Sequence, residues 1–294
     1  MSIPMNSTCI QCFLSKRLEF ARQQGTEQQA TEVGRMLMRA FVEAPPHVDS
    51  AWLGGVADEI VCRYFNIAPD RLRREKAQSN QFVLDRLPQI RSRVAQAADP
   101  VYAALQFAVL GNYLDFSALA GKVSFAHLDT MLEQALEMVL DQDCYRHFLS
   151  DLQKGKTLLY ITDNAGEIGF DRVLAEVLQQ HFPHLQITFC VRGLPVSNDA
   201  TREDAQVVGI PFPLLDNGTA IGGTVLHLIS PEAKQAIEQS DVILAKGMGN
   251  TESMFGCGHN VYYSFLVKCQ RFVEYFQKEM MTPMFIRDSQ YTAG

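Results

Sequence analysis

The segment TLLYITDNAGEIGFD, residues 157–171, constrains the fold more than any other part of this sequence. Thr157–Thr162 is mostly apolar or β-branched and predicts a buried strand. The small residues Ala165–Gly166 predict a turn after it. A helix is then expected to begin near Glu167 and to continue through Leu178. A strand that passes through a short turn into a helix is the repeating unit of parallel α/β sheets, so we expect such a sheet here.

Asp163 and Asn164 stand where this strand ends. In open α/β sheets, ligands bind where strands end and helices begin. An aspartate and an asparagine at that point supply two hard oxygen ligands for a metal, beside backbone N–H groups able to hold an anion. The alternative is an Asx turn that caps the helix, because both residue types favour that role. This segment alone leaves both interpretations open.

Strands and helices continue to alternate towards the carboxyl end. Leu185–Val191 and Asp241–Ala245 predict strands, and Val207–Leu215 is a weaker strand candidate because Pro211 and Pro213 interrupt it. Amphipathic helices are expected at Phe170–Gln180, Ala200–Val208 and Pro231–Gln239. This alternation predicts a mostly parallel sheet with helical cover.

Up to about residue 150 the apolar residues recur at helical spacing. Helices are predicted at Cys12–Gln24, Val33–Phe41, Phe82–Ala97, Val101–Leu110 and Leu128–Leu149. Asp99-Pro100 is a typical helix start, and the charge run Asp70–Lys76 is expected to be a solvated helix face. The sequence therefore predicts a helical region at residues 1–150 packed on an α/β domain at residues 151–294.

Composition and charge restrict the class of protein. A chain of 294 residues, 47% hydrophobic and 20% charged, is typical of globular proteins with a large core. A net charge of −7 argues against nucleic acid as a partner, although a local metal or lysine would still attract an anionic substrate. No apolar run reaches the roughly 18 residues that span a bilayer, so we expect no membrane partner. The amino-terminal residues lack the order of a signal peptide, which favours a cytoplasmic location.

Polar clusters also follow the other two predicted strands. Arg192–Asp204 carries Asn198 and Asp199 before a helix, and Lys246–Glu252 reads KGMGNTE. Because parallel strands align their carboxyl ends on one edge of the sheet, these loops should meet the Asp-Asn pair there. Two aspartates and an asparagine suit Mg²⁺ or Mn²⁺, and Lys246 adds a cation beside accessible backbone amides. That combination is suited to a phosphoryl group.

Taken singly, each of these residues is also compatible with a purely structural role. Asp199 is a plausible helix cap and Lys246 a plausible surface lysine; their joint placement at strand ends favours a functional site. The Rossmann pattern G-x-G-x-x-G, the P-loop pattern and G-x-S-x-G are all absent. A dinucleotide site, a P-loop NTPase and an ordinary serine hydrolase are therefore not favoured.

Only Cys9 and Cys12 of the seven cysteines have motif spacing, C-x-x-C. Such a pair is consistent with redox activity, with half of a metal site, or with two thiols on a helix that have no function. Cys257 and His259 would complete four ligands if the two ends of the chain met in space.

Three motifs, DNAGEIGFD, VRGLPVSNDATREDA and DVILAKGMGNTE, closely resemble the central motifs of the metal-dependent damage-control phosphatase family. The resemblance covers almost the whole chain and extends to Cys9 and Cys12, Lys76–Asn80, Asp99-Pro100, Gly111–Phe116 and Tyr262–Cys269. The C-x-x-C pair resembles the prokaryotic subfamily. The resemblance implies a three-layer α/β/α sandwich with a mostly parallel sheet and an amino-terminal all-helical region.

The resemblance also implies a site. Asp163, Asn164 and Asp199 would bind a divalent metal, namely Mn²⁺, Ni²⁺, Co²⁺ or Mg²⁺. Lys246 would hold the transferred phosphate. The substrates would be phosphomonoesters of small metabolites, including sugar phosphates, phosphopantetheine-like compounds and damaged phosphometabolites.

The resemblance also implies residues that would support the phosphate and the rest of the substrate. The backbone amides around Gly166 and Glu167 would assist the phosphate, and we expect Glu167 to be catalytic together with Asp163 and Lys246. Further substrate contacts are expected from Gly166, Asn198, Asn250, Asn112 and Asp115.

The residues leave three questions open. Asn112 and Asp115 lie on one helix face, where Asp115 is either a packing or capping partner or a contact for the non-phosphate part of the substrate. The nucleophile is either a metal-activated water or the carboxylate of Asp163. The alternative function is a binding or sensing protein that holds a phosphometabolite without turnover, if neither Glu167 nor Asp115 faces the metal as a general acid.

Overall fold

The computed structural model describes residues 3–45, 48–114 and 125–288. Its centre is a six-stranded sheet with the order β3-β2-β1-β4-β5-β6. The strands are β1 (Thr157–Ile161), β2 (Gln186–Val191), β3 (Leu214–Asp216), β4 (Val242–Lys246), β5 (Val261–Leu266) and β6 (Pro283–Arg287). Strands β1 to β5 are parallel, and β6 runs antiparallel to β5. The sheet is therefore mostly parallel, as predicted.

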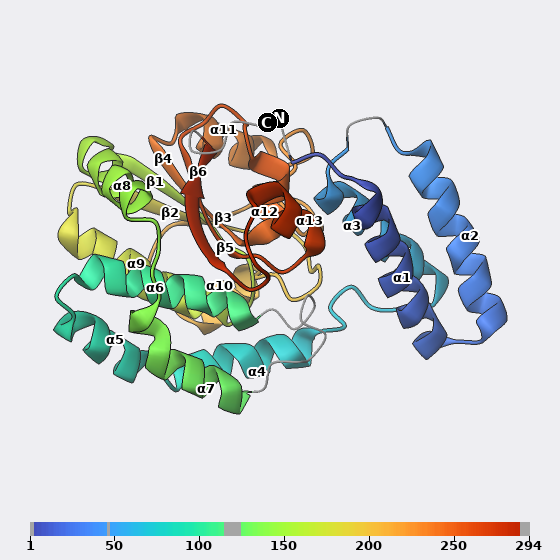
Figure 1. Ribbon diagram of the computed structural model, residues 1–294, viewed down its shortest axis with the longest axis horizontal. Coiled ribbons are helices and arrows are strands. Elements are labelled where there is room, and N and C mark those ends of the chain that lie inside the picture. Colours follow the sequence, from blue (N-terminus) through green and yellow to red (C-terminus); the bar gives the residue numbers. More distant parts are fainter. Residues whose placement is uncertain (1–2, 46–47, 115–124, 289–294) are drawn as a thin grey trace.

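Helices cover both faces of the sheet, and a further group stands beside it (Figure 1). The described residues form the α-helices α1 (Ser7–Gln24), α2 (Glu27–Glu43), α3 (Ser50–Tyr64), α4 (Arg73–Leu84), α5 (Leu87–Gln96), α6 (Pro100–Gly111), α7 (Phe125–Gln134), α8 (Gln142–Lys154), α9 (Glu167–His181), α10 (Arg202–Val207), α11 (Pro231–Gln239), α12 (Gly247–Met254) and α13 (Gln270–Phe276). Two short 3₁₀ helices are η1 (Asn112–Leu114) and η2 (Ala135–Glu137).

Alternate residues of the central strands face opposite layers of the molecule. Leu158 and Tyr160 of β1 belong to a core that also includes buried side chains of α4, α5, α6, α8 and α9. Leu159 and Ile161 belong to a second core with α11, α12 and α13. The chain is therefore a three-layer α/β/α sandwich, which confirms the predicted fold class. Helices from before residue 150 share the first core with the sheet.

Helices α1, α2 and α3 form a helical lobe with a small core of its own. Ala21, Val33, Leu37 and Val61 are among its buried side chains. In Figure 1 this lobe lies beside the sandwich, next to α12 and α13. It is the part of the predicted all-helical region that does not cover the sheet.

The segment before α1 joins the lobe to the sandwich. The N–H of Ile3 donates to the carbonyl of Glu252 on α12 at 3.1 Å, and Nε of Arg271 on α13 donates to the carbonyl of Pro4 at 2.9 Å. The lobe is therefore fixed against the carboxyl-terminal layer before its first helix begins.

The order of the strands reverses between β1 and β4. From β1 the chain proceeds outwards to β2 and β3, then returns to β4 on the other side of β1 and continues to β5. Connections from β1 and β4 therefore leave in opposite directions, and the carboxyl ends of these strands border a crevice. Doubly wound sheets bind their ligands at such a switch point.

The amino ends of β1 and β4 are joined by one carboxylate. Oδ2 of Asp241 accepts the backbone N–H groups of Lys156 at 2.7 Å and Thr157 at 3.1 Å, together with the Thr157 hydroxyl at 3.1 Å. The Asp241 N–H donates back to the Thr157 hydroxyl oxygen at 2.9 Å. These bonds set the relative register of the two strands that border the switch point.

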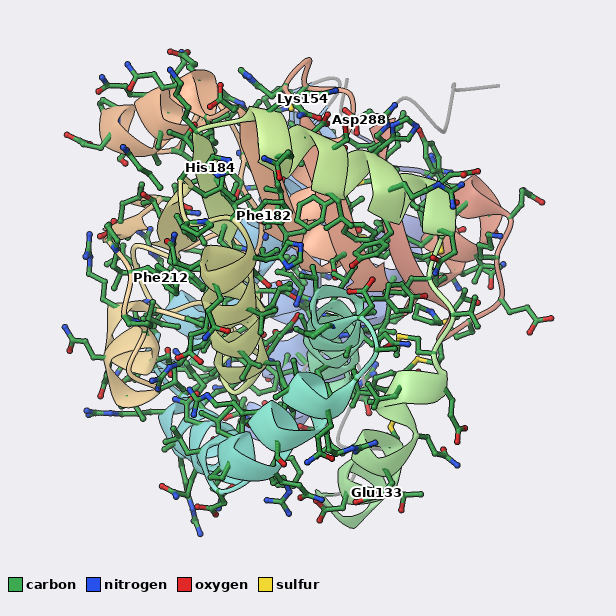
Figure 2. The ribbon with its side chains drawn as sticks, turned by 90° about the vertical axis from the view of Figure 1, so that its left-hand side faces the viewer. Glu133, Lys154, Phe182, His184, Phe212 and Asp288 are labelled. Carbon is green, nitrogen blue, oxygen red and sulfur yellow. The ribbon has the colours of Figure 1, made fainter. Side chains whose placement is uncertain are left out.

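Figure 2 shows the face of the molecule that carries α8 and α9, with Phe182 and His184 near the carboxyl end of α9. Their ring centroids lie 6.2 Å apart, and Nε2 of His184 lies 3.1 Å from the carbonyl oxygen of Leu152 on α8. The turn between α9 and β2 is thereby attached to α8.

Two predicted helices are each divided in the structure. The predicted helix Phe82–Ala97 is wrong as one element, because α4 ends at Leu84 and Pro88 stands in the first turn of α5. The predicted helix Leu128–Leu149 is also wrong as one element. Asp141 starts a new helix there, its carboxylate accepting the N–H of Cys144 at 2.8 Å.

Two further local predictions need correction. Val207 belongs to helix α10, so only the end of the predicted strand Val207–Leu215 lies in β3. The charge run Asp70–Lys76 is not a wholly solvated helix face, because α4 begins only at Arg73. The side chain of Lys76 is 12% exposed and pairs with Asp204 at 2.7 Å.

In the described part of the chain, no helix has both the length and the apolar character that crossing a membrane requires.

Candidate active site

The loops that follow β1 and β2 pair with each other through their backbones. The N–H of Ala165 donates to the carbonyl of Asn198 at 2.8 Å, and the N–H of Ala200 donates to the carbonyl of Asp163 at 2.7 Å. Asn164 and Asp199 face each other in an isolated antiparallel bridge. Asp163, Asn164 and Asp199 are thus brought together at the switch point, as the order of the motifs along the chain suggests. We call these three residues the oxygen triad.

Neighbouring amides orient the side chains of the oxygen triad. Nδ2 of Asn164 donates to Oδ2 of Asp163 at 2.7 Å, and Nδ2 of Asn112 donates to the same oxygen at 2.9 Å. Nδ2 of Asn198 donates to Oδ1 of Asn164 at 2.8 Å. Asn112 and Asn198, both predicted as substrate contacts, therefore bond directly to the triad.

Arg192 lies at the centre of this polar group, although the sequence analysis assigned it no role. Its side chain is 1% exposed, and its Nε donates to Oδ2 of Asp199 at 2.6 Å. Nη1 donates to Oδ1 of Asn250 at 3.1 Å, and Nη2 lies 4.0 Å from Oδ1 of Asp163. One buried guanidinium therefore faces both aspartates of the triad. Its signals in the sequence are its place directly after a buried strand and within the motif VRGLPVSNDATREDA.

The oxygen triad opens into a pocket of about 530 Å³ between the helical lobe and the sandwich. A neighbouring pocket of about 600 Å³ shares part of this wall, including Gly55, Asp58, Val196 and Ser197. The lobe contributes Cys9, Cys12, Phe13, Lys16, Arg17 and Gly54 to the first pocket. A ligand held by the triad would therefore also touch the helical lobe.

The donor set of the oxygen triad fits a hard divalent cation. Two carboxylates and one amide oxygen lie on the pocket wall, and carboxylate and carbonyl oxygens are the ligands that Mg²⁺ and Mn²⁺ prefer. The hydrogen bonds from Arg192 and the neighbouring amides hold these groups in place, as outer residues do around metal ligands. Asp163, Asn164 and Asp199 are the residues that would hold the ion.

Lys246 lies in a buried charge cluster next to this wall. Its ammonium donates to Oε1 of Glu167 at 2.7 Å, to Oδ1 of Asp171 at 2.8 Å and to the carbonyl of Ala108 at 2.8 Å. All three donors of the ammonium are used. A direct contact between Lys246 and a phosphate would therefore require one of these bonds to be exchanged.

The charges in this cluster depend on one another. Burial alone would lower the pKa of Lys246, but the charges of Asp171 and Glu167 outweigh burial and raise it above its usual value. Burial raises the pKa of Asp171 to about 6, against the opposing effect of Lys246. Burial also raises the pKa of Tyr160, whose hydroxyl donates to Oδ1 of Asp171 at 2.7 Å.

Glu167 has both carboxylate oxygens engaged. Oε1 accepts from Lys246, and Oε2 accepts Nδ2 of Asn112 at 2.9 Å and Nδ2 of Asn164 at 2.8 Å. Its side chain is 0% exposed. Glu167 therefore connects the charge cluster to the oxygen triad and is not among the residues that line the pocket.

The remaining predicted contacts lie around this core. The N–H of Gly166 donates to Oδ1 of Asn80 at 2.7 Å, so this amide is already bonded within the protein. Nδ2 of Asn250 donates to the carbonyls of Lys246 at 2.6 Å and Thr162 at 3.0 Å, which fixes the start of α12. Asp115 lies outside the described residues.

Glycines on α12 allow this helix to lie close to Asp163 and to the loop at Gly222. Gly247 has a φ of +80°, and a Cβ there would lie 2.0 Å from Oδ2 of Asp163. A Cβ on Gly249 would lie 1.8 Å from the carbonyl oxygen of Gly222. Side chains at these positions would displace the triad or the opposite loop.

Cys9 and Cys12 lie on α1 and line the pocket together with Cys269. Burial raises the pKa of the Cys9 thiol. Cys257 and His259 do not join Cys9 and Cys12 in a four-ligand metal site. Within the described ranges, no group of three or more His, Cys, Asp or Glu side chains is arranged to hold a metal ion.

The fold and this site together define a class, a doubly wound α/β protein with an oxygen-rich site at its switch point. The chain belongs to the family described as damage-control phosphatase ARMT1-like domain, which matches residues 5–282. The family predicted from the sequence motifs is therefore confirmed.

Archaeal proteins are similar to this chain over much of its length. An uncharacterized protein of Methanocaldococcus jannaschii is 32% identical, over 76% of this chain and 75% of that protein. A protein of Archaeoglobus fulgidus named damage-control phosphatase is 33% identical, over 61% of this chain and 62% of that protein. A damage-control phosphatase of Pyrococcus horikoshii is 32% identical, over 56% of this chain and 58% of that protein.

A crystal structure of a DUF89 family protein from Pyrococcus horikoshii superimposes with a TM-score of 0.82. The match covers 97% of this chain and 99% of the other, at 21% sequence identity. At that identity, the likeness supports the fold.

Proposed function

We propose that this protein is a metal-dependent phosphomonoesterase that acts on small phosphorylated metabolites. The observation that carries the proposal is the oxygen triad, Asp163, Asn164 and Asp199, at the carboxyl edge of the sheet and open to a pocket. Two similar archaeal proteins are named damage-control phosphatases, which supports the same class of reaction. The finer parts of the proposal are a cytoplasmic location and membership of the subfamily with the amino-terminal C-x-x-C pair.

The triad would hold a divalent cation, Mn²⁺, Ni²⁺, Co²⁺ or Mg²⁺, which would supply positive charge for the phosphate oxygens and lower the pKa of a bound water. Arg192 holds Asp199 and faces Asp163, so it would keep both carboxylates in position when the site is loaded. Glu167 would orient Asn164 through the hydrogen bond between their side chains.

Lys246 would act at the site through the buried charge cluster or, after exchange of one hydrogen bond, by direct contact with phosphate. The nucleophile is a water molecule or the carboxylate of Asp163. These alternatives are separable, because only attack by Asp163 produces a phosphoaspartate that can be trapped and detected by mass spectrometry.

The first test is hydrolysis of p-nitrophenyl phosphate and of a panel of sugar and other metabolite phosphates, with each of the four metals added to metal-free protein. We expect turnover that depends on the added metal and is lost with a chelator. Metal binding and phosphate binding without turnover of any ester would favour the binding or sensing protein instead.

A second test removes one of the proposed metal ligands. Asp163→Ala deletes a charged oxygen ligand, so Mn²⁺ binding measured by calorimetry and turnover should both be lost. Asp70→Ala removes an exposed aspartate and should leave both unchanged. If Asp163→Ala bound Mn²⁺ as tightly as the parent, the assignment of the metal site would be wrong.

A further inference from the structure

One face of α12 forms part of the pocket wall. Met248, Gly249 and Glu252 all line the pocket, and Glu252 shares a helix face with Met248 and Gly249 because it lies four and three residues after them. The same helix begins at Gly247, which lies against Asp163. Glu252 is about 7.5 Å further along the helix axis, at a rise of about 1.5 Å per residue. Glu252 therefore lines the same cavity as the oxygen triad, further along α12.

Glu252 differs from the other carboxylates of this pocket. Asp58 lies 2.9 Å from Arg17, and Asp199 lies 2.6 Å from Arg192, so each has a guanidinium partner. Asp163 faces Arg192 as well, at 4.0 Å. The carboxyl group of Glu252 instead forms a hydrogen bond with the side chain of Ser50, at the start of α3.

The groups around Glu252 come from α1, from the start of α3 and from the region of α13. Asp49 faces it from the start of α3 and is itself close to His227, and Arg271 faces it from α13. The thiols of Cys9 on α1 and Cys269 before α13 are also close. Burial raises the pKa of Glu252 to about 7; Asp49 adds to this effect, while Ser50 and Arg271 oppose it. At neutral pH a substantial fraction of this carboxyl group therefore carries a proton.

We propose that Glu252 is the general acid of the phosphatase reaction proposed above, on which this inference rests. The carboxyl group donates its proton to the ester oxygen while the bond between phosphorus and that oxygen breaks, which releases an alcohol. The oxygen of a water molecule forms the new bond to phosphorus. One proton of that water returns to the Glu252 carboxylate, so the enzyme is restored and the products are an alcohol and phosphate.

The neighbouring carboxylates are less suited to this step. Asp163 and Asp199 belong to the oxygen triad and would be ionised as metal ligands, and the carboxylate of Asp58 is held in an ion pair with Arg17 at 2.9 Å. Glu167 has both oxygens engaged and does not line the pocket. Glu252 is the pocket carboxyl group that combines access to the ligand with a raised pKa.

The test measures the hydrolysis of two esters by the parent protein and by the variant Glu252→Gln. The substitution keeps the shape of the side chain and removes the proton donor. A sugar phosphate has a poor alkoxide leaving group that needs a proton, whereas p-nitrophenolate leaves as a stable anion. We expect kcat for the sugar phosphate to fall about a hundredfold or more, the usual contribution of a general acid. Hydrolysis of p-nitrophenyl phosphate should fall by less than about threefold, because the missing step contributes little there.

Controls separate the role of Glu252 from damage to the site. Glu232→Gln changes an exposed glutamate on α11 and should leave both activities unchanged. The fall of kcat/KM for the sugar phosphate above about pH 7 should be present in the parent and absent in Glu252→Gln. Equal losses with both esters, or no loss with either, would overturn the role of Glu252. If the parent protein hydrolysed neither ester with any metal, the proposed function itself would be wrong.

Discussion

Lys246 illustrates how burial determines what a charged side chain can do. Its side chain is fully buried, and its ammonium is enclosed by Glu167, Asp171 and the carbonyl of Ala108. A buried ion cluster of this kind is costly to form, but removal of one partner leaves the others buried and uncompensated. A surface lysine, which the sequence alone allows at this position, could be changed to methionine with folding nearly intact. The structure contradicts that expectation, because two buried carboxylates would lose their counter-charge.

We therefore predict that Lys246→Met lowers the free energy of unfolding by about 3–5 kcal/mol. Denaturation in urea, followed by circular dichroism, measures this change. Lys234→Met on the exposed side of α11 is the matched control and should change stability little. A variant at Lys246 with parental stability would mean that the buried cluster rearranges at no cost.

The positions of the oxygen triad could be predicted from sequence, whereas Arg192 could not. Asp163, Asn164 and Asp199 follow strands of a parallel sheet, so topology alone brings them to one edge. Arg192 also follows a strand, but its hydrogen-bond partner Asn250 is far away in the sequence. Tertiary contacts of this kind leave no periodic signal in the residues around the arginine.

At the scale of the elements, the Asp241 carboxylate connects the starts of β1 and β4. Hydrogen bonds from the N–H groups of Lys156 and Thr157 and from the Thr157 hydroxyl hold the pKa of Asp241 below its usual value, against the opposing effect of burial. A carboxylate with a lowered pKa stabilises the fold above its unfolded pKa of about 3.9, and this contribution is lost as the pH falls through the folded value.

Asp241→Asn should therefore lower the melting temperature at pH 7. The loss should be about 2–4 °C if about 1 kcal/mol is lost, a modest amount because solvent screens the charge of an exposed carboxylate. The difference between parent and variant should shrink as the pH falls below about 3.9 and vanish below the folded pKa. Melting curves recorded between neutral and acid pH measure both effects. A difference that is independent of pH would show that the charge of Asp241 contributes nothing.

Element boundaries were harder to predict than element types. The strands at Thr157–Ile161 and Val242–Lys246 were recognisable because a buried parallel strand is a short, continuous apolar run. The break between α4 and α5 was missed because the apolar spacing continues across Pro88. Strands β5 and β6 were not predicted, and the segment Tyr262–Cys269 stood out only as a family motif.

On the scale of the whole molecule, the pocket lies between the helical lobe and the sandwich, and both contribute to its wall. A ligand that bridges the two parts stabilises the closed arrangement by mass action. We predict that Mn²⁺ with inorganic phosphate, at about 100 times their Kd, slows amide exchange in α1 and α3 by up to about a hundredfold.

Hydrogen exchange followed by mass spectrometry tests this prediction. Peptides of α8, which lies away from the pocket, serve as the internal control. If protection were confined to the loops around Asp163 and Asp199, the lobe would not take part in binding.

The shared core of the sandwich has a consequence for synthesis on the ribosome. Helix α8 emerges before every strand, but its Phe148 packs against Tyr262 on β5 and Phe285 on β6, near the end of the described chain. The lobe can collapse on its own small core as soon as α3 has left the exit tunnel. The ring of Phe148 must wait for more than a hundred further residues before these two partners are made. During that interval we expect the nascent chain to be a substrate for chaperones that bind exposed apolar surface, and a ribosome stalled before β5 would release a protein unable to complete its core.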